Sequence, residues 1–408
     1  MTSAHAPPRM IPCRNRRYRP PDAPMGCPPR TMVNMTRAWL IVLIVVAVAL
    51  ITVVGVALGV RAARKRHYQR IVSSRDDDQV HYAFIINPSK PQAGALRKRI
   101  AEFCEGRGLT QIEFIETQLN KDGRACAQEA LGHGADVLVA VGGDGTVRTV
   151  ASAVSGTGRP LGIIPIGTGN LFARNMDIPV DDVEAALAVA TSHGSRMVDV
   201  GRLAILDRDD EDYAHAFLII AGIGFDALMI DGTDPQLKKN ISWLAYFVSA
   251  MGHLFEPKNH GTVILTSEDG SVHTSHDVMF RTFLAGNCGQ IPMLSLMPEA
   301  ISDDGLLDFE LIDTTGGIIG WASLFGDVVH QTIVGKAQQS PLSTNSVIDQ
   351  IQGVAAEVTL KRKAFAQVDG DSLGETRHIR FSVDRQALCV RVPAGTDTSV
   401  ISPITNVS

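Results

Sequence analysis

The sequence of 408 residues lacks several common functional signatures. Its six cysteines are scattered, without a CxxC or Cys/His pairing, which argues against structural zinc and a disulfide framework and suits a reducing cytosolic environment. Lysine and arginine number 38 against 43 aspartate and glutamate, so no global positive charge indicates a nucleic-acid partner. Neither a Walker loop nor a GxGxxG fingerprint is present. The length suffices for two ordinary domains.

The N-terminal region has a composition of its own. Residues 1–36 are rich in Pro and Arg, which predicts disorder, and the 23 residues at 38–60 carry no charge, which predicts a transmembrane helix. A cleaved signal peptide is the alternative, but the flank Arg61 to Arg66 is too basic for a good cleavage site. That basic flank predicts a single-pass protein of the cell membrane with its C-terminal part in the cytoplasm. Gly55 and Gly59 are a faint hint of a homodimer.

From about residue 80, strand and helix patterns alternate. Short runs rich in Val and Ile are typical of buried parallel strands, and apolar side chains recur at helical spacing between them. The pattern predicts a doubly wound α/β nucleotide-binding domain with a parallel sheet over residues 80–195. Its expected strands are Tyr82–Ile86, Gln111–Glu116, Val137–Val141 and Leu161–Ile166, and its expected helices lie at 94–106, 125–131, 147–154 and 183–190.

After about residue 196 the pattern changes to many short strands joined by turns. Only two helices are expected there, Ser242–Leu254 and Gly320–Val334. The region 196–395 is therefore predicted to be a mostly antiparallel β-sandwich domain. Its expected strands lie at 200–206, 216–220, 261–266, 271–278, 281–284, 307–312, 354–360, 365–368, 379–383 and 388–392.

Two glycine turns follow neighbouring expected strands, at 142–146 (GGDGT) and 167–170 (GTGN). Glycine lets the backbone approach an anion, and the helix behind the first turn directs unpaired N–H groups toward it, so the pair predicts a phosphate site. Asp144 would repel phosphate oxygens unless a cation lay between them, which suggests Mg²⁺. An ordinary turn is the alternative for the first string alone, and the second glycine turn disfavours it.

Three clusters in the second half could carry chemistry. The turn at 222–227 combines glycines with Asp226, which alone is more often a bend than a site. Three carboxylates fall within 303–308, which suits a hard cation or an ordinary solvated turn. Asp369 and Asp371 flank Gly370 in a tight turn, where a general base could lie.

In order and spacing these motifs resemble the diacylglycerol kinase catalytic family of bacterial lipid kinases, which is diacylglycerol/sphingosine kinase-like. The resemblance covers about residues 80 to 395. It implies an ATP-dependent lipid kinase with a nucleotide domain, a β-rich lipid-substrate domain and an active site in the cleft between them. The motifs are Asn87-Pro88, GGDGT at 142–146, PIGTGN at 165–170, GIGFDA at 222–227, PEAISDDGLLD at 298–308 and DGD at 369–371.

The resemblance also implies residue roles. The family's structural Mg²⁺ site corresponds to a side-chain oxygen of Asp304 and the backbone carbonyls of Ile301 and Leu306. The family's proton acceptor is usually the Glu of a DGE motif, and Asp371 stands in its place, with Asp369 as its rival. The substrate cleft would include Gly224 and Asp226. The ATP-binding positions correspond to Asn87, Pro88, Ser89 and on to Pro91, Thr117, Gly142, Gly143, Asp144, Gly145, Thr146, Gly167, Thr168 and Asn170.

The chain departs from the usual family pattern at Leu171, where Asp is common, and at Arg148 and Thr149, where Asn and Glu are common. These departures leave the acceptor lipid open, although diacylglycerol or a related lipid is expected. The predicted function is a membrane-anchored lipid kinase that uses ATP and Mg²⁺ and transfers the γ-phosphate to a lipid hydroxyl. The alternatives are a kinase of NAD or of a soluble sugar, since GGDGT also occurs in those families, and a catalytically inactive nucleotide or lipid sensor.

Overall fold

The structure is a computed structural model in which residues 79–89, 93–208, 213–224, 258–289, 297, 300–314 and 346–394 are described. The chain divides into two units, Met1–Arg64 and Lys65–Ser408, and all described residues belong to the second. The segments predicted as disordered (1–36) and transmembrane (38–60), the Gly55/Gly59 pair, and the helices expected at 242–254 and 320–334 lie outside the described residues.

The predicted single-pass membrane localisation is corrected by the helices that the structure describes. Within that part of the chain, none is both long enough and apolar enough to cross a bilayer. The segment on which the prediction rested is not among the described residues.

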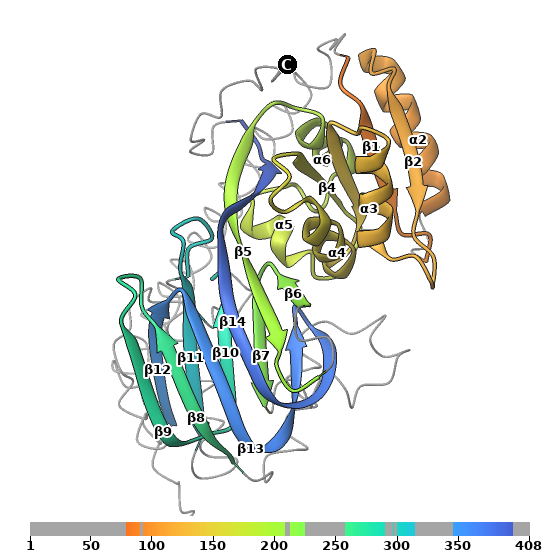
Figure 1. The fold of residues 1–408 in the computed structure, drawn as a ribbon. Helices are drawn as coiled ribbons and strands as arrows, with labels where there is room; N and C mark the ends of the chain where they lie inside the picture. The colour runs from red at the N-terminus through yellow and green to blue at the C-terminus, as the bar shows by residue number, and fades with distance from the viewer. Residues whose placement is uncertain are drawn as a thin grey trace, which may run out of the picture. The chain divides into compact units, whose positions relative to one another are not determined.

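The first part of the second unit is the predicted α/β arrangement (Figure 1). Its strands β4, β3, β1 and β2 pair in parallel in that order. Tyr82–Ile86 and Val183–Ala190 form as predicted, residue for residue. The elements are β1 (Tyr82–Ile86), α2 (Ala93–Arg107), β2 (Ile112–Glu116), α3 (Gly123–Gly132), β3 (Val137–Gly142), α4 (Asp144–Val154), β4 (Pro160–Pro165), α5 (Leu171–Asn175) and α6 (Val183–Ala190).

Helices cover both faces of this parallel sheet, as a doubly wound fold requires. Successive side chains of a strand point to opposite faces, so Phe84 of β1 packs with α2 while Ile85 packs with α3 and α4. Every residue of β1, β3 and β4 is buried, which explains why these strands are continuous apolar runs rather than alternating ones.

The second part is rich in antiparallel strands, as predicted. Several expected strands are joined into longer ones, and β14 alone runs over 21 residues. The elements are β5 (Ser195–Ile205), β6 (Ala214–Phe217), β7 (Ile220–Gly224), β8 (Asn259–Thr266), β9 (Val272–Phe280), β10 (Thr282–Gly286), β11 (Leu307–Thr314), β12 (Ser346–Gly353), β13 (Ala355–Val368) and β14 (Asp371–Arg391).

The two parts share one connected sheet, which differs from the predicted nucleotide domain beside a separate sandwich. The path is β12-β11-β10-β7-β13-β14-β4-β3-β1-β2, with β8–β9 branching from β13 and β5–β6 from β14. Because Cys389 and Val390 of β14 pair in parallel with Pro160 and Leu161 of β4, the last strand extends the first part's sheet. In Figure 1, β5 and β14 run side by side through both parts.

The core of the strand-rich part lies where the sheet forks. Side chains of β5, β7, β8, β10, β11, β13 and β14 form one buried apolar cluster. Phe283 lies at its centre, with ring centroids 5.9 Å from Phe309 and 5.8 Å from Phe381. Side chains of β5 and β8, one strand from each branch, therefore share one core with strands of the main path.

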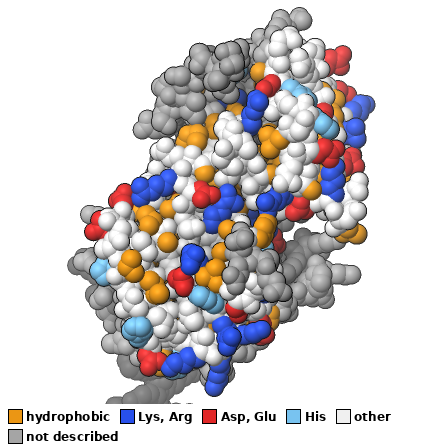
Figure 2. Space-filling model, viewed as in Figure 1, with side chains coloured by type: hydrophobic (Ala, Val, Ile, Leu, Met, Phe, Trp, Pro, Cys, Tyr) orange, Lys and Arg blue, Asp and Glu red, His pale blue; other side chains and the backbone are white. Residues whose placement is uncertain are grey.

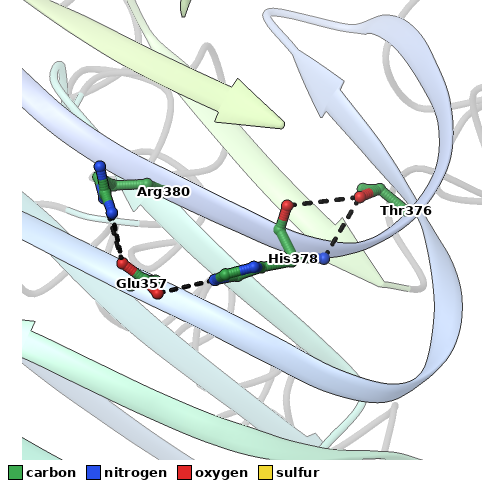
Figure 3. Close-up of polar contacts among 4 residues, drawn as sticks. All are labelled: Glu357, Thr376, His378 and Arg380. Atoms are coloured by element: carbon green, nitrogen blue, oxygen red, sulfur yellow. Dashed lines mark hydrogen bonds and ion pairs between the residues drawn. The ribbon is translucent and has the colours of Figure 1, made fainter. Parts of the chain in front are cut away.

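Polar side chains also join β13 to β14 on their outer side. Glu357 lies directly opposite Arg380 in the antiparallel register. Its carboxylate accepts hydrogen bonds from Arg380 Nη2 at 2.9 Å and lies 2.7 Å from His378 Nε2 (Figure 3). Cross-strand pairs of this kind stabilise a chosen register. Over the face drawn in Figure 2, acidic and basic side chains are interspersed.

Candidate functional site

The two predicted glycine turns lie against each other at the carboxyl ends of β3 and β4. The N–H of Ile166 donates to the carbonyl of Gly142 at 2.9 Å. A Cβ on Gly143 would lie 3.2 Å from the Cα of Gly167, and one on Gly167 would lie 2.6 Å from the Cα of Gly143. Only glycine permits this backbone-on-backbone contact, which brings both loops to one place.

Asp144 connects these two loops. Its Oδ1 accepts hydrogen bonds from the N–H groups of Leu171 at 2.6 Å and Phe172 at 3.4 Å, which open the five-residue helix α5. Burial raises the pKa of the Asp144 carboxyl, and the N–H groups of Phe172 and Leu171 lower it. The sequence predicted a cation beside Asp144, and the structure adds a structural role that the pattern did not indicate.

Asn170 shapes the second loop from within. It adopts the left-handed conformation with φ 48°, which Asn tolerates better than most residues. Its Oδ1 accepts from Gly167 N at 2.9 Å, and its Nδ2 donates to Gly167 O at 2.9 Å. Because its polar atoms are used in this way, Asn170 acts by holding the loop. Thr168, two residues earlier, is exposed.

Asn87, after β1, joins the first glycine loop. Its N–H donates to Val141 O at 3.1 Å, and its Nδ2 donates to Thr146 Oγ1 at 3.3 Å. Its own Oδ1 accepts from the N–H of Ser89 at 3.0 Å, which forms a turn. Pro88 and Ser89 are exposed, and the expected nucleotide positions 90 and 91 lie outside the described residues.

Thr117 is placed in the same way at the end of the neighbouring strand. Its N–H donates to the carbonyl of Ile86 at 2.9 Å. The carboxyl ends of β1, β2, β3 and β4 thus place Asn87, Thr117 and the two glycine loops along one edge of the parallel sheet. Ligands of doubly wound folds bind at this edge.

Asp369 and Asp371, the rival bases, have different environments. The carboxylate of Asp369 accepts from the N–H groups of Leu218 (2.8 Å), Ile219 (3.0 Å) and Ile220 (2.9 Å). Burial raises the pKa of Asp369 to about 6, while Arg148 and these N–H groups lower it. Asp369 therefore holds the connection between β6 and β7, which leaves its carboxylate little capacity to act as a base.

Asp371, at the start of β14, lies beside the first glycine loop. A Cβ on Gly145 would lie 3.6 Å from Asp371 Oδ2. The same oxygen is 2.5 Å from Nη2 of Arg148 on α4. The Asp371 side chain is 57% exposed and that of Arg148 is 12% exposed, so the carboxylate is accessible while the arginine is mostly enclosed. The pairing between Arg148 and Asp371 was not predicted.

The acidic turn at 301–308 is held to β5. Asp199 is fully buried and accepts from Gly305 N at 2.7 Å, and Asp303 pairs with Arg196 at 2.8 Å. Asp304 Oδ1 accepts from Leu306 N at 2.9 Å. Partial burial raises the pKa of Asp304, and the carboxylates of Asp308, Asp199 and Asp303 raise it further, while the Leu306 N–H lowers it.

This turn is compatible with the expected Mg²⁺. A cation would offset the crowding of carboxylates that raises the pKa of Asp304, and oxygen donors suit a hard ion. Within the described residues, no group of three or more His, Cys, Asp or Glu side chains could hold a metal. The expected ligands are one carboxylate and the carbonyls of Ile301 and Leu306, so this set stays a prediction.

The expected substrate cleft is placed only in part. Gly224 ends β7 with φ 124°, and a Cβ there would run into the carbonyl oxygen of Arg281 on the adjacent chain segment. The glycine is therefore required for close strand packing. Asp226 lies outside the described residues. The assignment of both residues to a cleft stays a prediction.

Known proteins are similar to this chain in sequence. Residues 81–203 match the family model described as "Diacylglycerol kinase catalytic domain". A Pseudomonas aeruginosa protein named "Probable lipid kinase YegS-like" is 30% identical over 310 residues, covering 74% of this chain and 92% of the relative. A protein of the same name from Xanthomonas oryzae pv. oryzae is 27% identical over 320 residues, covering 77% and 96%.

A solved structure is similar over most of this chain. The crystal structure of a diacylglycerol kinase from Bacillus anthracis str. Sterne aligns with a TM-score of 0.56 at 19% identity, covering 77% of this chain and 97% of that one. At this identity the likeness concerns the fold alone.

Proposed function

Because the chain belongs to the diacylglycerol kinase catalytic domain family of lipid kinases, we propose that it transfers the γ-phosphate of ATP to a hydroxyl group of a lipid. The observation that carries the proposal is the position of Asp371. Its exposed carboxylate lies against Gly145 of the first glycine loop, where a base would meet a hydroxyl beside a bound phosphate.

The glycine loops are the proposed phosphate site. The eleven-residue helix α4 begins directly after Gly143 and directs its first N–H groups toward the carboxyl edge of the sheet. The close contact of Gly143 with Gly167 places the second loop beside these groups. Backbone N–H groups fixed in this way stabilise negative charge without reorganising during the reaction.

The transfer step follows from this arrangement. The lipid oxygen attacks the γ-phosphorus, a new O–P bond forms, and the bond from that phosphorus to the bridging oxygen breaks, so that ADP leaves. The proton of the lipid hydroxyl passes to a carboxylate oxygen of Asp371. Asp369 would hold the turn that carries this carboxylate through its three backbone hydrogen bonds.

Asp304, with the carbonyls of Ile301 and Leu306, would hold Mg²⁺. A bound divalent cation supplies positive charge that offsets neighbouring carboxylates and phosphates. Asp144 keeps the two glycine loops together through Leu171, and its carboxylate charge would favour a cation between it and the phosphates.

Diacylglycerol or a related lipid is the proposed acceptor, by extension from the names of the relatives. The test is to incubate the purified full-length protein with γ-labelled ATP, Mg²⁺ and detergent-dispersed mixed lipids, and to identify labelled products by mass spectrometry. A labelled lipid is expected. Labelling of NAD or a sugar instead would reassign the acceptor, and ATP binding with no labelled product would identify a catalytically inactive sensor.

A further inference from the structure

Arg148 occupies an unusual position for a residue on the second turn of α4. It lies two residues after the glycine loop at 142–146, and its side chain is mostly enclosed. Its Nη2 reaches Oδ2 of Asp371, a residue 223 positions later in the chain. The pair connects the helix behind the phosphate loop to the turn between β13 and β14.

The guanidinium has donor capacity left after this contact. Its Nε is buried and has no hydrogen-bond partner in the described part of the chain. A buried donor without an acceptor is destabilising, so an anion that accepted a hydrogen bond from it would relieve that penalty. The side chain thus combines a contact to Asp371 with an N–H that has no acceptor among the described residues, on the helix behind the loop that would hold phosphate.

The other two departures from the family pattern do not reach Asp371. The Thr149 hydroxyl donates to the carbonyls of Gly145 at 3.0 Å and Thr146 at 3.1 Å, within its own helix. The Leu171 side chain packs beside Gly169 and against the apolar core. Arg148 is therefore the substitution that changes the surroundings of the base.

We propose that Arg148 is a further residue of the transfer site, which positions Asp371 through Nη2 and donates from its remaining N–H groups to the transferred phosphoryl group. This inference rests on the proposed function. Arginine suits both tasks because its planar fork can bind a carboxylate and a phosphate oxygen together, which a lysine ammonium does not reproduce.

The experiment compares Arg148→Asn and Arg148→Lys with Arg159→Asn in the full-length protein. Arg159 is a matched control, because its Nη1 makes an ion pair of the same 2.5 Å length with Asp136, at the opposite ends of β3 and β4. Arg148→Asn should lower kcat about 10²-fold, as expected for losing one preorganised donor, with little change in the KM for ATP. The kcat of Arg148→Lys should lie between that of Arg148→Asn and that of the parent. The kcat of Arg159→Asn should equal that of the parent.

A double-mutant comparison separates positioning from general stability. If Arg148 acts partly through Asp371, the Arg148→Asn substitution should slow the Asp371→Asn protein by a smaller factor than it slows the parent, because residues that act as a unit are not additive. A role in folding alone would instead lower the melting temperature. Arg148→Asn would then slow the parent and the Asp371→Asn protein by the same factor.

The outcomes are distinguishable from failure of the proposed function. If Asp371→Asn is impaired while both Arg148 variants keep the parent's kcat, the inference about Arg148 is overturned and the kinase proposal stands. If the parent protein phosphorylates no lipid, the function itself fails. Should Arg148→Asn not fold, Arg148→Lys decides, since an unchanged kcat with lysine would exclude a need for the guanidinium.

Discussion

Oδ1 of Asp144 accepts a hydrogen bond from the backbone N–H of Leu171, 27 residues later, at 2.6 Å. The carboxylate of one glycine loop therefore caps the short helix that follows the other. Asp144 thus has one structural role, in which its oxygen caps α5, and one proposed role, in which its charge favours a cation. An asparagine separates the two, because it keeps one acceptor oxygen but has no charge.

We expect Asp144→Asn to melt close to the parent while losing productive ATP binding, because the cap persists and the charge beside the phosphates does not. Asp144→Ala should lose both and be destabilised by about 1 kcal/mol, the usual cost of a lost helix cap. Urea unfolding and titration with ATP at saturating Mg²⁺ measure the two effects. Undiminished turnover of Asp144→Asn would leave the carboxylate a purely structural role.

Asp371→Asn should lower kcat by roughly 10² to 10⁴, the range typical of a positioned base, and leave ATP affinity nearly unchanged. Asp371→Glu, which restores the residue common in the family, should keep measurable activity. Steady-state kinetics on detergent-dispersed lipid provide the test. Normal turnover of Asp371→Asn combined with an inactive but folded Asp369→Asn would move the base to Asp369.

Asp369 should make stability depend on pH. Its folded pKa is raised to about 6, above the unfolded value of 3.8, so the folded state holds the proton more tightly. The resulting stabilisation is present below pH 4 and is lost as the pH rises through 6, by about 3 kcal/mol at 1.36 kcal/mol per pKa unit. The free energy of unfolding, measured between pH 4 and 7, should fall as the pH rises. In Asp369→Asn this dependence on pH should be weaker. An identical slope in the variant would show that other groups dominate.

Glu310 on β11 should behave similarly at higher pH. Burial raises its pKa to about 8 from 4.5, with a further contribution from Asp308. Its protonated form is favoured in the folded state, so the associated stability is lost as the pH rises through 8, by an amount on the order of 5 kcal/mol. Glu310→Gln should therefore be more stable than the parent at pH 9 and nearly equal at pH 5. Thermal melts of both proteins at pH 5 and pH 9 test this expectation. Equal stability of the two proteins at pH 9 would contradict it.

Asp304→Asn should raise the Mg²⁺ concentration needed for half-maximal activity, because it removes the one charged ligand of the expected site. Asp303→Asn is the control, since Asp303 already pairs with Arg196. A Mg²⁺ titration of all three proteins measures the shift. Activity of the parent that survived complete chelation would reject a metal requirement.

Elements stabilised by local pattern could be predicted from the sequence. The strand Tyr82–Ile86 is buried throughout and the helix Val183–Ala190 is buried from Ala185 on, and both have a clear apolar pattern, so their bounds were predicted to the residue. Helix α5 was missed because it has five residues and its cap comes from Asp144 in another loop. Local propensity contains no information about such a distant partner.

The same reason limited the prediction of the site. The glycine loops could be predicted because Gly143 and Gly167, which contact each other, both belong to the motifs. The structure places the two loops together. The sequence favoured Asp371 over Asp369 as the base, through the resemblance and its more exposed place past Gly370. The hydrogen-bond partners of the two carboxylates could not be predicted, because they are the backbone N–H groups at 218–220 and Arg148, far away in the chain. Two carboxylates two residues apart look alike until their partners are known.

The parallel pairing of β14 with β4 has a consequence for how the protein is made. Cys389 lies opposite Pro160, which is 229 positions earlier in the chain. A ribosome has to synthesise nearly the whole chain before β4 can receive its second neighbour, and contacts of such long range form slowly. A nascent chain that stopped before residue 389 would carry β4 as an open strand edge, the kind of surface that chaperones cover and that aggregates recruit.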